Sequence, residues 1–237
     1  LMRHDTPLIG AMLGILKAGG ILVVLNPNDP PRRLSQLLEN SEAAAIVTDD
    51  THKQSAGEIA SGRVVHEFGA ADSCETVDDC GVDVVPDDVA ALTYTSGSTG
   101  QPKAVMQTHL QMTYNAYRQS RLMKLTPGDR VALLASIGGS QGLTTAWCAL
   151  QNGASLWPYP VMDKGAEGLG DWIAASAISV YISSPSLFRH FIKSLREGAI
   201  LSSLRIAKLG AEQATSEDFA AFQKHFPEDA IFVHTLG

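Results

Sequence analysis

The chain has 237 residues, of which 45% are hydrophobic and 18% are charged. This balance excludes a disordered chain, a coiled coil and a protein that coats nucleic acid. The formal net charge is −7 and no run of Lys and Arg stands out, which is the wrong sign for a general binder of phosphate backbones. We therefore expect one large folded domain or two small lobes, with no nucleic-acid partner.

The cysteines and the longest uncharged segment restrict the cellular setting. Cys74, Cys80 and Cys148 show no Cys-x-x-Cys spacing, which argues against a disulfide framework and against a zinc site. Free thiols are typical of a reducing compartment, so we expect a cytoplasmic protein. Residues 131–162 contain no charge, but glycines, prolines and amides interrupt them, so the sequence predicts no membrane span.

Apolar runs alternate with helical patterns in the first half of the chain. Residues 6–18 have the broad apolar face of a helix that a glycine pair ends, and a proline pair opens a second helix at residue 31. The next helix is expected from Thr108, because Thr108 and Gln111 have the spacing of a capping box. Strands are predicted over residues 21–25, 43–47, 63–66 and 89–95.

The second half repeats this alternation after a turn at residues 125–129. That turn is the predicted boundary between a first lobe, residues 1–124, and a second lobe, residues 125–237. Ser184 and Ser216 are the predicted N-caps of two helices. Together the pattern predicts an α/β fold, with two α/β lobes that have largely parallel sheets and flanking helices. Strands are predicted over residues 130–135, 178–183, 204–209 and 230–233.

The segment from Thr95 to Lys103 has the composition of an anion-binding loop. It holds four hydroxyl residues, two glycines, one proline and one lysine. Glycines let successive backbone N–H groups converge on an anion, and the lysine adds a positive charge. The spacing fits neither a Walker A loop nor Gly-x-Gly-x-x-Gly. A flexible Ser/Gly linker is the alternative reading. The predicted polyphosphate ligands are Thr95, Ser96, Gly97, Ser98, Thr99, Gly100 and Lys103.

The run from Tyr94 to Lys103 resembles the phosphate-loop signature of the adenylate-forming, or AMP-binding, superfamily. That superfamily includes acyl-CoA synthetases and the adenylation domains of nonribosomal peptide synthetases. The resemblance continues along the chain. Residues 16–30 are similar to an upstream helix–strand motif, residues 210–212 to a Gly-Gly-Glu strand end, and residues 234–237 to the start of an aromatic-Gly-x-Thr-Glu motif.

The resemblance implies a ligase that uses ATP and Mg²⁺ to convert a small carboxylic acid into an acyl-adenylate. The acyl group then passes to the thiol of coenzyme A or of a carrier-protein phosphopantetheine. By the same resemblance, Lys103 and the neighbouring hydroxyls hold the β- and γ-phosphates, and Lys103 is the catalytic candidate. The implied adenine site consists of Gly210, Ala211, Glu212, His234 and Gly237.

The sequence departs from the family pattern at four places. Ala104 and Ala211 replace glycines, and Leu236 stands where an aromatic residue is usual. The sequence also ends at Gly237, before the expected Thr-Glu. We therefore expect an internal piece of a larger enzyme, truncated at both ends, that folds but does not turn over alone.

The acyl pocket is expected to be neutral. Amino-acid-activating members of the family carry an Asp whose counterpart here is Ser140, and residues 131–162 contain no Asp or Glu. An unpaired buried ammonium is costly, which disfavours a standard α-amino acid. One alternative is that this helix is simply part of the core. The predicted pocket has Ser140, Gln141 and Thr144 on one wall and Ala207 and Leu209 on the other.

Two other function classes compete with this interpretation. Residues 138–142 match the Gly-x-Ser-x-Gly nucleophile elbow, so an α/β-hydrolase-like esterase would use Ser140 with a downstream Asp and His. No oxyanion-loop pattern precedes this motif, and the Lys103 loop would have no role. The third class is a non-catalytic nucleotide-binding module.

Overall fold

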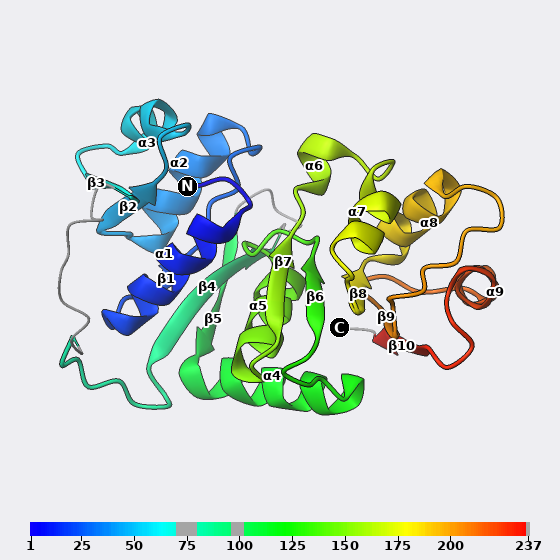
Figure 1. Ribbon diagram of the computed structural model, residues 1–237. Coiled ribbons are helices and arrows are strands. Elements are labelled where there is room, and N and C mark those ends of the chain that lie inside the picture. Colours follow the sequence, from blue (N-terminus) through cyan, green and yellow to red (C-terminus); the bar gives the residue numbers. More distant parts are fainter. Residues whose placement is uncertain (70–79, 96–101, 236–237) are drawn as a thin grey trace. The chain divides into compact units, whose positions relative to one another are not determined.

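The computed structural model describes residues 1–69, 80–95 and 102–235, with helices and strands labelled in Figure 1. The chain forms two compact units. Unit 1 consists of Leu1–Met112 with Gly138–Ser140, and unit 2 of Thr113–Ile137 with Gln141–Gly237. The division falls inside helix α4 (His109–Met123), ahead of the turn at residues 125–129 that the sequence suggests as the lobe boundary. The reason is that Ala116 and Met123 of α4 pack into the core of unit 2.

Unit 1 contains two small sheets. One has the order β1-β4-β5, in which β1 runs parallel to β4 and β5 runs antiparallel to it, and the other pairs β2 with β3 in parallel. The predicted helices and strands of this half are confirmed, although the first strand is only two residues long. The elements are α1 (Thr6–Lys17), β1 (Leu22–Val23), α2 (Pro31–Ser41), β2 (Ala45–Thr48), α3 (Lys53–Ile59), β3 (Val64–Glu67), β4 (Val89–Thr95) and β5 (Lys103–Thr108).

One core cluster of unit 1 lies beside an apolar pocket. Leu34, Leu37 and Leu38 form the buried stripe of α2 and pack against Ile46 of β2 and Ile59 of α3. Next to this cluster lies an apolar pocket of about 410 Å³, lined by α1, β1 and the segment that leads into β2. Unit 1 therefore contains two separate sheets and an apolar pocket beside the cluster formed by α2, β2 and α3.

Strand β5 is a correction to the sequence prediction. The sequence suggested that the Gly/Ser/Thr turn leads directly into a helix, whereas β5 returns along β4 as the second arm of an antiparallel hairpin. The helix then starts at His109, and the predicted capping box is confirmed. The Thr108 N–H donates to Gln111 Oε1 at 3.0 Å, and the Gln111 N–H donates to Thr108 Oγ1 at 3.2 Å.

Unit 2 is built on one five-stranded parallel sheet with the order β10-β9-β8-β6-β7. The α/β class with largely parallel sheets is therefore confirmed. All four strands predicted for this half are present, while the edge strand β7 was not predicted. Besides α4, the elements are β6 (Arg130–Leu133), α5 (Ser140–Gln151), β7 (Ser155–Pro158), α6 (Val161–Lys164), α7 (Leu169–Ala175), β8 (Val180–Ser183), α8 (Pro185–Ser194), β9 (Ile206–Gly210), α9 (Ser216–His225) and β10 (Ile231–Thr235).

Alternation along the strands divides the core of unit 2 into two layers. On one face, Tyr181 and its neighbours pack against Phe188 of α8 and Phe222 of α9. On the other, Val180 and Ile206 pack with Met123 of α4 and with residues of α5. Both faces are buried, which explains why these strands read as continuous apolar runs.

Helices α8 and α9 begin at side-chain caps. Ser184 accepts a hydrogen bond from the Leu187 N–H, as predicted. The cap of α9 is Thr215 and not Ser216, because Thr215 and Asp218 form a reciprocal capping box. The carboxylate of Asp218 also holds Arg189 of α8 at 2.7 and 2.8 Å, so the same side chain joins the two helices.

The amino ends of three strands of unit 2 meet at Asp129. Its side chain is 3% exposed and pairs with the Arg205 guanidinium through both carboxylate oxygens, while the Ser179 hydroxyl donates to it at 2.7 Å and the Thr126 N–H at 2.8 Å. Burial alone would raise the pKa of Asp129, but Arg205, Ser179 and Thr126 stabilise the carboxylate more and lower its pKa to about 2.

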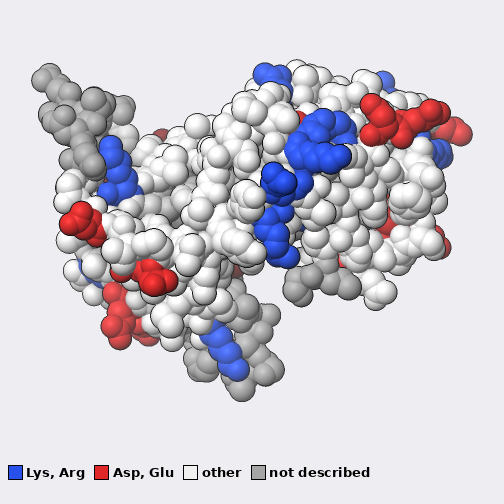
Figure 2. Space-filling model, turned by 90° about the horizontal axis from the view of Figure 1, so that it is seen from below, with Lys and Arg blue, Asp and Glu red and all other residues white. Residues whose placement is uncertain are grey.

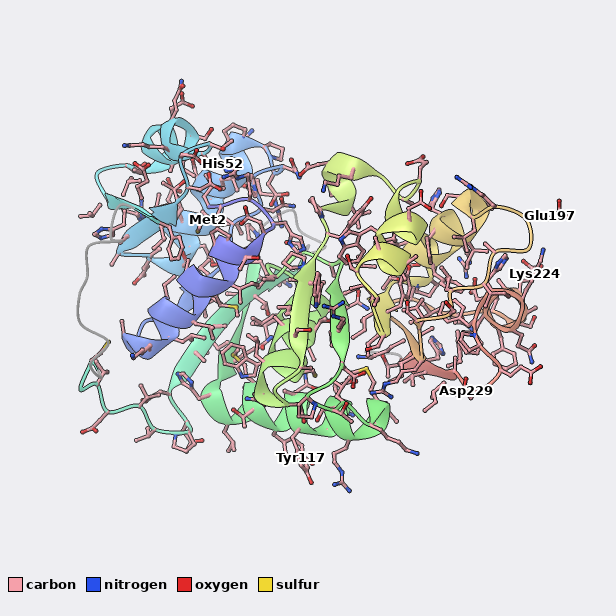
Figure 3. The ribbon with its side chains drawn as sticks, in the orientation of Figure 1. Met2, His52, Tyr117, Glu197, Lys224 and Asp229 are labelled. Atoms are coloured by element: carbon pink, nitrogen blue, oxygen red, sulfur yellow. The ribbon has the colours of Figure 1, made fainter. Side chains whose placement is uncertain are left out.

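The solvent-facing side of α4 is aromatic and basic. Tyr114 and Tyr117 are 63% and 57% exposed, and the Arg121 guanidinium lies 5.9 Å from the centre of the Tyr117 ring. Figure 3 shows Tyr117 pointing away from the sheet, and Figure 2 shows Lys and Arg side chains gathered over this part of the helix. Arg118 and Lys124 are the other exposed basic residues here, and this surface holds none of the candidate site residues.

Over the described ranges, no helix is long and apolar enough to cross a membrane. Within the same ranges, Cys80 and Cys148 are free thiols, and burial raises the pKa of Cys148 to about 11. Cys74 lies outside the described residues.

Candidate functional site

The phosphate-loop candidate is the tip of the β4–β5 hairpin. Thr95 and Lys103 are directly paired at its end, so the two chain ends of the Ser/Gly/Thr segment start from neighbouring positions. Lys103 is exposed and, among the described residues, has no hydrogen-bond or ion-pair partner. Its ammonium is therefore available to an anion. The structure describes the backbone of Thr95, while the other predicted ligands, Ser96, Gly97, Ser98, Thr99 and Gly100, lie outside the described residues.

The adenine-site candidates lie at the carboxyl ends of β9 and β10. Gly210 is paired in register with Thr235, the neighbour of His234. The two predicted motifs therefore lie side by side at the carboxyl ends of the strands, which form one rim of the sheet and are called its carboxyl edge. In parallel sheets this edge is where ligands bind. A Cβ on Gly210 would lie 3.1 Å from Thr235 Oγ1 and 3.2 Å from Gln141 Nε2, so close packing favours glycine there. Gly237 lies outside the described residues.

The turn after β9 is held from two directions. Nε2 of His234 lies 3.1 Å from the Glu212 carbonyl oxygen and 3.2 Å from the Ala214 nitrogen. The Glu212 carboxylate accepts hydrogen bonds from the N–H and the hydroxyl of Ser186, at 3.2 and 2.5 Å, in the first turn of α8. The carboxylate of Glu212 therefore interacts with α8, and the backbone of residues 210–212 is the part that remains for a ligand.

The predicted acyl-pocket residues divide between the two faces of the sheet. Gln141 donates to the Ser183 carbonyl at 3.2 Å and lies against Gly210, and Thr144 accepts from Asn115 of α4 at 3.1 Å. Both are on the α4/α5 side. Ser140 opens α5 with an exposed side chain.

Ala207 and Leu209 instead lie in the core with Phe188 and Phe222, on the α8/α9 side. The structure thus does not bring them to the wall that carries Gln141 and Thr144. The physical reason is strand alternation, which turns Lys208 and Gly210 of the same strand toward α5.

Lys208 is a buried charge that the sequence interpretation missed. It is 6% exposed in the middle of β9, and burial lowers the pKa of its ammonium, with Cys148 and Arg118 as its charged or titratable neighbours. A lysine inside an apolar run was the available signal, because such a position is rarely occupied by an unpaired charge.

One known protein family matches the whole length of this chain. The sequence model of the family described as "AMP-binding enzyme" matches residues 1–237. The chain belongs to the AMP-binding enzyme family.

Several curated proteins are similar over most of the chain. Syringomycin synthase SyrB1 of Pseudomonas syringae pv. syringae is 30% identical over 216 residues, which cover 89% of this chain and 34% of that protein. Surfactin synthase subunit 2 of Bacillus subtilis is 31% identical over 241 residues, which cover 99% of this chain and 7% of that protein. The chain thus spans about a third or less of the length of these relatives.

Solved structures of other proteins show the same fold. The nonribosomal peptide synthetase FmoA3 superposes with a TM-score of 0.86 at 21% identity, covering 100% of this chain and 25% of that chain. VinN in complex with L-aspartate superposes with a TM-score of 0.85 at 23% identity, covering 100% of this chain and 61% of that chain.

Membership in the AMP-binding family removes the support for an esterase, and Gly142 gives the motif a packing explanation. A Cβ on Gly142 would lie 2.1 Å from the Ser136 carbonyl oxygen, so α5 can approach the preceding turn only with glycine at this position. Across the described residues, no hydrogen bond joins Ser140 to a histidine. Gly142 of the Gly-x-Ser-x-Gly pattern is therefore explained by helix packing.

Proposed function

We propose that this chain forms the nucleotide- and acid-binding part of an enzyme that activates a carboxylic acid with ATP. A carboxylate oxygen forms a bond to the α-phosphorus, the bond from that phosphorus to the bridging oxygen of the β-phosphate breaks, and pyrophosphate leaves with the electron pair. The product is an acyl-adenylate. The observation that carries the proposal is the family's Ser/Thr/Gly signature at the tip of a hairpin whose last pair is Thr95 and Lys103.

Electrostatic positioning is the chemistry that the hairpin tip supplies. Pyrophosphate is a good leaving group only when its negative charge is neutralised, and Lys103 is an exposed cation at the base of the loop. Mg²⁺ supplies further charge neutralisation when it accompanies ATP. In the described part of the chain, no three His, Cys, Asp or Glu residues cluster as a metal site. Mg²⁺ is typically held by substrate phosphates with one or two carboxylates, so phosphate oxygens of ATP would be among its ligands.

The carboxyl edge of the unit 2 sheet is the proposed adenine and acid site. The backbone of Gly210, Ala211 and Glu212, with His234 beside it, borders the adenine. Gln141 and Thr144 border the acid. Both are neutral, and the absence of any Asp or Glu from residues 131–162 favours an acid without an α-ammonium group.

The proposed acyl acceptor is the phosphopantetheine thiol of a carrier protein. A relative and a solved structure that match almost all of this chain are named as nonribosomal peptide synthetases, which supports a carrier protein over free coenzyme A. The proposed cellular location is the cytoplasm, where ATP and reduced thiols are both available.

The first test removes the positive charge at the hairpin tip. Lys103→Ala should weaken ATP binding by about 1.5–3 kcal/mol, or roughly 10- to 150-fold, because charge-assisted hydrogen bonds to the phosphates are lost. A fluorescent ATP analogue measures the affinity, and ATP–pyrophosphate exchange by the intact protein measures the activation step. Lys17→Ala, an exposed lysine of α1, is the matched control. Wild-type affinity and exchange in Lys103→Ala would contradict the proposed phosphate site.

The second test addresses the acid. Exchange should be stimulated by fatty or aryl acids and not by standard α-amino acids. Selective stimulation by one standard α-amino acid would overturn the neutral-pocket proposal, while the phosphate-site proposal would be unaffected.

A further inference from the structure

The turn after β9 contains the one described non-glycine residue that adopts a left-handed backbone without a helix end to explain it. Five described non-glycine residues have a positive φ. Four of them follow the last turn of a helix, namely Glu42, Ser61, Lys124 and Ala177. A left-handed residue is the usual way to end a helix. Ala211, with a φ of 69°, instead follows a strand.

This backbone conformation costs free energy that glycine would avoid. The Cβ of an L-residue in the left-handed region lies too close to backbone atoms, and such residues persist only where surrounding contacts hold them. Something in the structure must therefore hold the turn from Ala211 to Ala214 in place.

The contacts that hold the turn come from β10 and α8. Nε2 of His234 lies between the Glu212 carbonyl oxygen and the Ala214 N–H, at 3.1 and 3.2 Å. One ring nitrogen can donate to the carbonyl or accept from the N–H, and either bond ties the turn to β10. On the other side, Ser186 donates twice to the Glu212 carboxylate. Ala211, which has the left-handed backbone, is thus followed directly by Glu212, whose carboxylate and carbonyl are both held by hydrogen bonds.

We infer that His234 is a positioning residue that keeps the 211–214 turn in the conformation that borders the nucleotide. This inference rests on the proposed function, in which the backbone of residues 210–212 borders adenine. Without the imidazole, only the bonds from Ser186 to Glu212 hold the turn, so Ala211 leaves the left-handed region more readily and the nucleotide must reorder the turn when it binds. The affinity for nucleotide then falls, while the stability of unit 2 changes little because His234 is exposed.

Residue 211 offers a direct way to separate positioning from nucleotide contact. Glycine at this position removes the strain, so the turn no longer depends on the imidazole. If His234 acts through the turn, Ala211→Gly should restore much of the affinity that His234→Ala loses. If the imidazole contacts the nucleotide itself, the glycine restores nothing.

The experiment measures ATP and AMP affinity of the 237-residue chain by fluorescence competition. His234→Ala should weaken binding by about 3- to 10-fold, the value of one or two exposed hydrogen bonds. His234→Gln should stay within about 2-fold, because its amide reaches as far as Nε2 and can both donate and accept. The double variant His234→Ala, Ala211→Gly should return to within about 2- to 3-fold of wild type. His190→Ala, an exposed histidine of α8, is the matched control.

Each outcome assigns the failure to one statement. If the unchanged chain binds no adenine nucleotide, the proposed function is wrong for this chain and the inference falls with it. If the chain binds nucleotide and His234→Ala binds equally well, only the positioning role is wrong. A weak His234→Ala that glycine at 211 fails to rescue also overturns positioning. Should His234→Ala unfold, the comparison of His234→Gln with the shorter His234→Asn decides, since only Gln is expected to retain affinity.

Discussion

The two units solve the problem of burial differently. Unit 2 packs helices on both faces of one five-stranded sheet, whereas unit 1 divides its strands between sheets of three and two. Of the twelve largest side chains that are almost fully buried, only Met12 belongs to unit 1. Unit 1 also exposes Val105 and Met106 on β5, at 46% and 67%, and contains the apolar pocket of about 410 Å³.

This difference matches the kind of candidate residues that each unit carries. The candidate phosphate residues belong to a hairpin whose second strand is largely exposed. The candidate adenine and acid residues stand at the edge of a sheet that is buried on both faces. A polyphosphate is held by backbone and charge and tolerates a solvated loop, while a flat base and a small acid need rigid walls.

The largest expected effect on stability comes from a substitution of Asp129, the buried carboxylate at which three strands of unit 2 meet. Asp129→Asn should destabilise unit 2 by about 3 kcal/mol, because Arg205 loses its partner at a buried position. The three tryptophans, Trp147, Trp157 and Trp172, all lie in unit 2, so the urea dependence of tryptophan fluorescence reports that unit selectively. Asp49→Asn in unit 1 is the matched control and should leave the tryptophan transition in place.

Acid should weaken unit 2 through the same carboxylate. The pKa of Asp129 is lowered to about 2 in the folded protein, below the usual value of about 3.9 in an unfolded chain. Its contribution to stability is therefore complete above about pH 4 and is lost as the pH falls toward 2. Urea midpoints of wild type and Asp129→Asn, measured between pH 7 and pH 2, should converge at the acid end. A constant difference over this range would contradict the assignment.

A pair of glycines should give opposite signs in the two units. Gly142→Ala should destabilise unit 2 by about 2 kcal/mol, because the new Cβ would lie 2.1 Å from the Ser136 oxygen. Gly14→Ala in α1 has no atom within 4 Å of the new Cβ and should stabilise unit 1 by about 0.5–1 kcal/mol. Calorimetry of both variants measures the two shifts. Equal shifts would show that the two units do not differ in packing as described.

The smallest effect concerns helix caps. Thr215→Ala should cost about 1 kcal/mol, because the capping box with Asp218 is lost. In unit 1, Asp5 precedes α1 without a side-chain cap bond, so Asp5→Ala should stay within about 0.5 kcal/mol of wild type. Thermal unfolding of the two variants tests the contrast, and a larger loss for Asp5→Ala would reverse it.

Sequence patterns predicted most of the fold because buried strands and capped helices leave strong local signals. The strand at residues 89–95 was predicted with its observed bounds, and Pro185 after Ser184 marked the start of α8. Strand β5 was missed because its exposed residues show no alternation, and β7 because it is a short edge strand that ends in Pro158. The cap of α9 was placed one residue late, although Asp218 stands three residues after Thr215 and not after Ser216.

The site was predictable at the level of motifs and not at the level of faces. The sequence located Gly210 and His234 directly after predicted strands, and in the structure they lie at or near the carboxyl ends of β9 and β10. It placed Lys103 at the end of a loop, whereas the structure has Lys103 as the first residue of β5. It also grouped Ala207 with Leu209, which do share a face. Which helix covers that face depends on tertiary packing, and no local pattern encodes it. The only sequence signal for the left-handed backbone of Ala211 was that similar sequences of the family usually have glycine at this position.

The strand order of unit 2 has a consequence for how the protein reaches its native state. The paired residues of neighbouring strands are about 25 residues apart in the chain: Val131 with Leu156, Val180 with Ile206, and Ile206 with Ile231. Each of these pairs therefore closes a segment that contains a whole helix. Such non-local pairing slows folding toward the millisecond-to-second range, because loop closure precedes any gain from contact. During synthesis β10 emerges after the other four strands of this sheet and adds to β9. The strand that carries His234 therefore joins the unit only after the rest of the sheet can form, and nascent chains pass through a period in which the edge of β9 is open to other strands.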